Sequence, residues 1–155
     1  WLMIAGLPLA VLSAVYTAYL FAQSKGRDLW QSPLLPPHLF VQTVLSGAAV
    51  LLPFAASYEP SAVRPLVWTI AGASLAHLLF VWGEATLAHP TAHARLAAHE
   101  MISGAYRGFF WFAIVLVLAG LAAPWAGVVV APLVLLGLLC HEHAYVQSGQ
   151  AVPLA

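Results

Sequence analysis

An imidazole and a carboxylate lie seven residues apart in a stretch of the sequence that is otherwise almost entirely apolar. His77 and Glu84 are about 20° apart around a helix, and Ser74 continues the same face. Ionisable side chains inside a membrane are costly unless they are paired or reached by water, so they usually have a function. The pattern makes His77 and Glu84 candidate residues of a proton path. The alternative is a structural pair that locks two helices together.

Two further polar faces start near the loop between the first two apolar segments. Tyr16 and Tyr19 share a face of the first segment, and His38, Gln42 and Ser46 follow one another at intervals of four residues on the second. A phenol or an amide can hydrogen-bond the carbonyl oxygens of a quinone. We therefore predict a quinone headgroup site formed by Tyr16, Tyr19, His38 and Gln42. The alternative for the tyrosines is that they only hydrogen-bond across helices. The alternative for the second segment is that His38 lies in the membrane interface and that Ser46 and Gly47 allow close helix contact.

Other ligand-type residues do not form a clear metal motif. His89 and His93 have helical spacing for a shared metal, but no third ligand follows at a fixed distance. We expect the remaining histidines, including those of residues 141–143, to be solvated at the membrane interface. Cys140 alone cannot supply the cysteines of an iron–sulfur cluster. The sequence thus predicts no bound metal on this chain.

The composition predicts an all-α integral membrane protein. Hydrophobic residues make up 63% of the chain and charged residues 6%, whereas soluble domains have roughly 25% charged residues. A spanning helix needs about 20 predominantly apolar residues, and about five such helices are expected, with one short interfacial helix at 89–107. The expected spans are 1–23, 38–57, 65–88, 108–123 and 125–146. The net charge is zero, without a basic run, so no nucleic-acid partner is expected.

The chain opens inside an apolar run that has neither an initiating Met nor a basic region before it. This pattern favours a spanning helix over a signal peptide. We expect the natural protein to begin earlier.

Three segments, in their order and spacing, resemble the NrfD/PsrC-type membrane subunits of polysulfide reductase, cytochrome c nitrite reductase systems and alternative complex III. The segments are YTAYLFAQSKGRDLWQSPLLP, ARLAAHEMISGAYRGFFW and AYVQSGQAVPL. The resemblance spans essentially the whole chain. It implies that the five expected helices are the last five of a bundle of eight or more.

The resemblance also implies a function. The chain would exchange electrons between menaquinone or ubiquinone, bound reversibly, and a ferredoxin-like iron–sulfur subunit, with associated proton transfer. Larger catalytic or cytochrome subunits would complete the complex, and the reaction of the soluble substrate would belong to another chain. The location would be the cytoplasmic (inner) membrane of a bacterium or archaeon, crossed several times.

Individual residues acquire roles through the same resemblance. Tyr16 matches the family tyrosine that helps to hold the quinone headgroup. Lys25, Arg27, Asp28 and Trp30 would lie on the face that meets the iron–sulfur subunit.

Two other functions stay open from the residues alone. A subunit that binds haem b would need facing axial histidines, and His77 is the one histidine well inside an expected span. A proton-coupled transporter or a passive membrane anchor would use His77 and Glu84 to bind a substrate or to lock helices.

Overall fold

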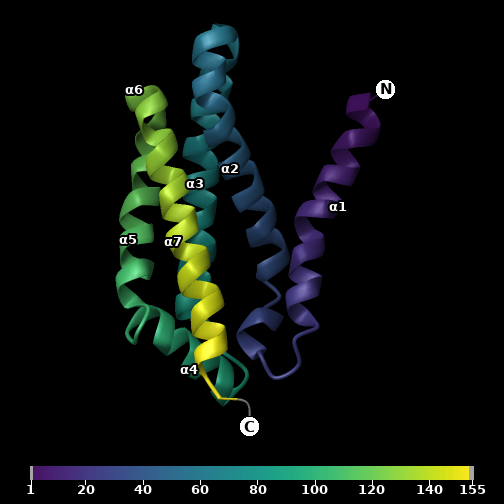
Figure 1. Ribbon diagram of the computed structural model, residues 1–155, viewed down its shortest axis with the longest axis vertical. Coiled ribbons are helices and arrows are strands. Elements are labelled where there is room, and N and C mark those ends of the chain that lie inside the picture. Colours follow the sequence, from purple (N-terminus) through teal and green to yellow (C-terminus); the bar gives the residue numbers. More distant parts are fainter. Residues whose placement is uncertain (1, 154–155) are drawn as a thin grey trace.

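The computed structural model describes residues 2–153, and these residues form helices joined by short turns, without a strand (Figure 1). The first residue of the expected span 1–23 lies outside the described part. The α-helices are α1 (Leu2–Ala22), α2 (Leu35–Tyr58), α3 (Val63–Thr86), α4 (Ala92–Ile102), α5 (Arg107–Leu118), α6 (Ala123–Ala126) and α7 (Val130–Ala151). The 3-10 turns are η1 (Asp28–Gln31), η2 (Pro60–Ala62), η3 (Ala119–Ala122) and η4 (Gly127–Val129).

Four stretches of the described chain are long and apolar enough to cross a membrane. They are Ile4–Ala22, Leu35–Tyr58, Pro60–Thr86 and Arg107–Ala151. The last stretch contains 45 residues and folds back on itself at α6, so that α5 and α7 lie side by side (Figure 1). The short helix α4 lies within the polar segment 89–107, at the opposite end of α5 from α6.

The start of α2 shows how prolines set a helix boundary. The helix begins at Leu35 instead of residue 38, and Pro36 and Pro37 occupy its first turn. The N–H groups of a first turn have no partner within the helix, so prolines cost little there. The earlier start places His38 inside the helix, one turn from its N-terminus.

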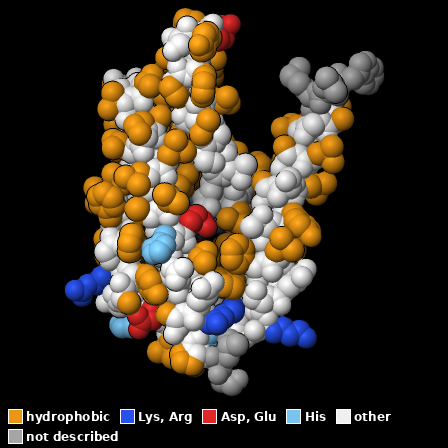
Figure 2. Space-filling view, in the orientation of Figure 1, with side chains coloured by type: hydrophobic (Ala, Val, Ile, Leu, Met, Phe, Trp, Pro, Cys, Tyr) orange, Lys and Arg blue, Asp and Glu red, His pale blue; other side chains and the backbone are white. Residues whose placement is uncertain are grey.

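The helices α2, α3, α5 and α7 pack into a bundle, and α1 leans away from it (Figure 1). The bundle core contains fully buried Leu45, Leu52, Ile70, Val117 and Val134. The helix α1 packs mainly on α2 at the end nearest the loop, and most of its described side chains are exposed. Figure 2 shows hydrophobic side chains along the helices and the Lys and Arg side chains of this face at the lower end.

A second core closes the lower end of the bundle. It joins η1, α4 and the last turns of α7 through Leu29, Trp30, Met101 and Tyr145. The Tyr145 hydroxyl donates a hydrogen bond to the Leu29 carbonyl at 3.0 Å. Trp30 lies directly against Gly149, where a Cβ atom would come within 2.3 Å of the indole nitrogen. The loop after α1 is therefore held against the end of α7.

Candidate functional site

Three histidine side chains from three helices meet inside the bundle. His38 of α2, His77 of α3 and His141 of α7 are each at most 1% exposed, and one ring nitrogen of each lies within 4.8 Å of the others. The ring centroids are 4.8 Å apart for His38 and His77, 4.9 Å for His77 and His141, and 5.4 Å for His38 and His141. We call these residues the histidine triad.

Hydrogen bonds connect the triad to Gln42. His38 Nε2 and His77 Nδ1 are 2.9 Å apart, so one ring donates an N–H and the other accepts it. The amide nitrogen of Gln42 lies 3.4 Å from both His38 Nε2 and His141 Nδ1. Gln42, one turn after His38 on α2, therefore bridges α2 and α7.

Two carboxylates lie against the triad from the outside. Glu84, which is 4% exposed, places Oε1 3.5 Å from His38 Nδ1, and the partly exposed Glu142 places Oε1 3.7 Å from His141 Nδ1. Among the described residues, Nε2 of His77, Nε2 of His141 and both oxygens of Glu84 have no hydrogen-bond partner. Buried polar atoms are nearly always paired in proteins, so these atoms are open to a hydrogen bond from water or a ligand.

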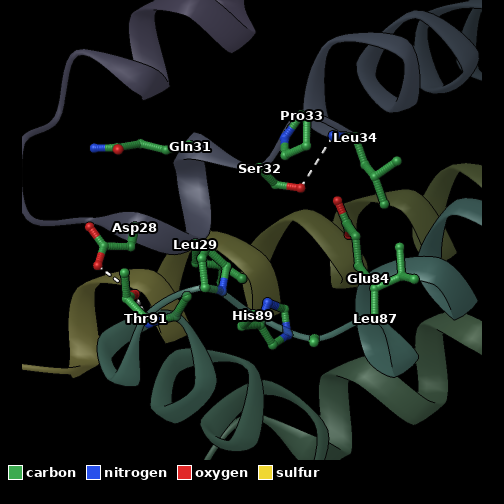
Figure 3. A pocket seen from close by; sticks show the side chains of 13 residues that line it. Asp28, Leu29, Gln31, Ser32, Pro33, Leu34, Glu84, Leu87, His89 and Thr91 are labelled. Atoms are coloured by element: carbon green, nitrogen blue, oxygen red, sulfur yellow. Dashed lines mark hydrogen bonds between the residues drawn. The ribbon is translucent and has the colours of Figure 1, made fainter.

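Glu84 also lines a cavity of about 270 Å³ near the lower end of the bundle. Figure 3 shows Glu84 and Leu34 on one side of this cavity and Asp28 and Thr91 on the other, with His89 between them. The Thr91 hydroxyl donates a hydrogen bond to Asp28 at 2.6 Å. Glu84 therefore connects the cavity with His38.

A groove of about 400 Å³ runs along α1, α2 and α7 on another side of the triad. Its wall is mostly apolar, but it includes Gln42, Glu142, Thr17 and Ser46. Gln42 and Glu142 thus approach the triad and line the groove as well. The groove and the cavity are joined through Gln42, the triad and Glu84.

The structure does not bring the predicted quinone-binding residues together in one pocket. His38 and Gln42 are buried in the bundle, whereas Tyr16 and Tyr19 are 59% and 61% exposed on α1. The buried side of α1 is that of Ala18, about 200° around the helix from Tyr16. The apolar side chains of α1 do not indicate which face packs on α2, so the sequence could not predict this rotation.

The charged loop contacts the chain itself. Arg27 donates three hydrogen bonds, of 2.9 to 3.0 Å, to carbonyl oxygens at the C-terminal end of α7. Asp28 accepts the bond from Thr91, and Trp30 is 7% exposed and packs against Phe21. Of the four residues predicted to meet a partner, Lys25 is the exposed one.

The prediction for residues 141–143 was wrong for His141. His143 is exposed, as expected, but His141 is buried between α2 and α3. A sequence signal was present, because His141, Tyr145 and Ser148 lie at helical spacing on one face, and all three are buried. The local HEH sequence masks this longer period.

The bundle and its buried ionisable centre define an integral membrane protein with a polar site between its helices. The family model described as "Polysulphide reductase, NrfD" matches residues 1–153. The chain therefore belongs to the NrfD family, which comprises membrane subunits of quinone-linked oxidoreductases. The predicted fold class and family are confirmed. No curated protein and no solved structure matched the chain in the other two comparisons.

Proposed function

We propose that this chain exchanges electrons between the membrane quinone pool and an iron–sulfur subunit, and that protons move with the electrons. The observation that carries the proposal is the NrfD family match over residues 1–153. Oxidation of a quinol to a quinone releases two electrons and two protons, which must leave by different routes. The electrons go to the partner's clusters, and ionisable side chains of the bundle accept the protons.

The proposed proton path runs through Glu84 and His77. Glu84 lines the cavity near the end of the bundle and lies 3.5 Å from His38, which in turn is hydrogen-bonded to His77 at 2.9 Å. On the other side, Gln42 connects the triad to the groove. A proton released in the groove could thus reach the cavity through short steps between polar groups.

The quinone headgroup has two proposed contact points on this chain. Tyr16 presents its phenol on the exposed face of α1, where a lipid-soluble ligand has access. Gln42 presents an amide in the groove. Tyr16 and Tyr19 are exposed on α1, whereas His38 and Gln42 lie inside the bundle on α2. We therefore propose the two pairs as separate contacts.

The proposed partners are a ferredoxin-like iron–sulfur subunit and larger catalytic or cytochrome subunits, in the cytoplasmic membrane of a bacterium or archaeon. The iron–sulfur subunit would meet the lower end of the bundle around the loop after α1. Lys25 is the exposed charge of that loop available to it. Arg27, Asp28 and Trp30 would support the surface from beneath through their internal contacts.

The triad does not suit haem b. A porphyrin bound by two histidines has to fit between their rings, but His38 and His77 are joined directly by a hydrogen bond of 2.9 Å. His141 lies against both rings with centroid distances of 4.9 and 5.4 Å. The side chains would have to move apart to admit the macrocycle.

The test compares Tyr16→Phe and Gln42→Leu in the purified complex with quinol as electron donor. Each substitution removes one proposed hydrogen bond to the headgroup, so we expect KM for quinol to rise about tenfold, which corresponds to the 1 to 1.5 kcal/mol of one such bond. Tyr58→Phe is the matched control, because Tyr58 is an exposed tyrosine at the far end of α2. If both variants keep the wild-type KM and turnover, the proposed quinone contacts on this chain are wrong. If the wild-type complex does not oxidise quinol, the proposed function itself is wrong.

A further inference from the structure

We propose that His38, His77 and His141 form a binding site for one divalent transition-metal ion of the zinc type. Imidazole nitrogens bind zinc at 2.0 to 2.1 Å, and three imidazoles on a tetrahedral ion have ring centroids about 5 Å apart. The centroid distances of the triad are 4.8, 4.9 and 5.4 Å. The rings are thus close to the spacing that a shared ion requires, with one ring nitrogen of each within 4.8 Å of the others, and the ion would take the place of the hydrogen bond between His38 Nε2 and His77 Nδ1.

The carboxylates around the triad give independent support. A histidine that binds a metal through one ring nitrogen usually directs the other nitrogen to a carboxylate, a carbonyl group or water. His38 Nδ1 faces Glu84 at 3.5 Å, and His141 Nδ1 faces Glu142 at 3.7 Å. His38 Nε2 faces His77 Nδ1 at 2.9 Å, and Nε2 of His141 has no hydrogen-bond partner among the described residues.

The charges of the site also match a divalent ion. Three neutral imidazoles leave an ion with two positive charges, which is costly in a membrane interior unless it is balanced. Glu84 and Glu142, each beside one triad histidine, supply two negative charges when ionised.

Three protein ligands leave the fourth position of a tetrahedral ion open to water, and zinc makes a bound water release its proton readily. Glu84, which lies behind His38 and lines the cavity, would balance the charge of the ion and connect the site with the cavity. This role of Glu84 deepens the proposed proton path and rests on the proposed function. The binding of the ion itself does not depend on that function. His77 would then act as a ligand on the path, and the proposal departs from the sequence prediction of no bound metal.

The test measures metal in the purified full-length protein, prepared without chelators and then incubated with Zn²⁺ and washed. We expect about one zinc per wild-type chain, and at least a tenfold loss of zinc affinity in His38→Gln, His77→Gln and His141→Gln. Glu84→Gln should weaken binding by about 10- to 100-fold, as loss of such an outer carboxylate does. His143→Gln is the matched control, because His143 is an exposed histidine two residues from His141.

Zinc bound equally by the wild type and all three triad variants would overturn the proposal, as would a wild-type chain that holds no zinc. X-ray absorption spectroscopy of the zinc-loaded wild-type chain identifies the atoms that bind zinc, and it does not depend on a variant that folds. Three nitrogen ligands support the site, and a shell of oxygen ligands alone overturns it. Quinol turnover is measured on the same preparations, so a chain that binds zinc without oxidising quinol retains the site and loses the proposed function.

Discussion

At the scale of single residues, Glu84 is the side chain at which the cavity and the histidine triad meet. It is buried near the end of α3, lines the cavity and lies beside His38. The sequence identified Glu84 and His77 as a pair on one helix face. In the structure the Glu84 carboxylate lies 3.5 Å from His38 of the neighbouring helix α2, because the rotation of α2 turns this ring toward α3.

Replacement of Glu84 by Gln should slow quinol-dependent turnover by about tenfold or more, while leaving the fold intact. The substitution keeps the size of the side chain but removes its capacity to take up a proton, and positioned proton acceptors contribute at least this much. Steady-state turnover of the purified complex measures the effect. Glu84→Asp should restore part of the rate.

Glu59→Gln is the control for this experiment, because Glu59 is an exposed carboxylate at the other end of α2. If Glu84→Gln and Glu59→Gln retain wild-type turnover alike, Glu84 has no part in proton movement.

At the scale of elements, the hairpin of α5 and α7 depends on a close approach at Gly137. A Cβ atom at this position would lie 2.9 Å from Val117 Cγ2, 3.0 Å from Leu116 Cβ and 3.2 Å from the Ala113 carbonyl oxygen. Small residues allow membrane helices to pack closely, since lipid chains provide little drive to join them. The hairpin therefore relies on this contact to keep α7, and with it His141, in position.

Gly137→Ala should lower the stability of the bundle by about 1 to 3 kcal/mol, because the added methyl group overpacks the contact between α5 and α7. Thermal unfolding in detergent, followed by circular dichroism, measures the change as a lower midpoint.

Gly47→Ala is the matched control, because nothing lies within 4 Å of a Cβ atom at Gly47. Alanine favours a helix over glycine, so this variant should be as stable as the wild type or more so. Equal effects of the two substitutions would show that the close approach at Gly137 does not limit stability.

At the scale of the whole molecule, the loop after α1 ties the start of the described chain to its end. Arg27 reaches three carbonyl oxygens at the C-terminal end of α7, where the helix dipole favours a positive charge. The same loop leads directly into α2, which carries His38. The connection thus couples the surface proposed for the partner to the helix that contributes the first triad residue.

Arg27→Met should destabilise this end by about 1 to 3 kcal/mol, since it removes partly buried hydrogen bonds from a charged donor. Hydrogen exchange followed by mass spectrometry should show faster exchange in the last turns of α7. Lys25→Met, at the exposed position two residues earlier, is the control and should leave exchange unchanged. Unchanged exchange in Arg27→Met would mean that the loop does not hold α7.

The sequence by itself determined the all-helical membrane fold, the family and the general position of the helices. Apolar segments of spanning length and the prolines at residues 36, 37, 60 and 124 define where helices can run. These are local properties of the chain. The bounds of the helices differ from the expected ones by a few residues, as at the start of α2, where Pro36 and Pro37 fit in the first turn, and at the end of α7, which runs on to Ala151.

Only the tertiary structure decided which polar residues share a site. His38, His77 and His141 are far apart in the chain and meet because of the rotation and axial position of three helices. Membrane helices are apolar on nearly every face, so hydrophobic periodicity does not specify their rotation. For that reason the sequence shows that the Tyr16 phenol can donate a hydrogen bond, but not toward which side of the bundle it points. The position of His141 at the centre of the bundle likewise follows only from the packing of the helices.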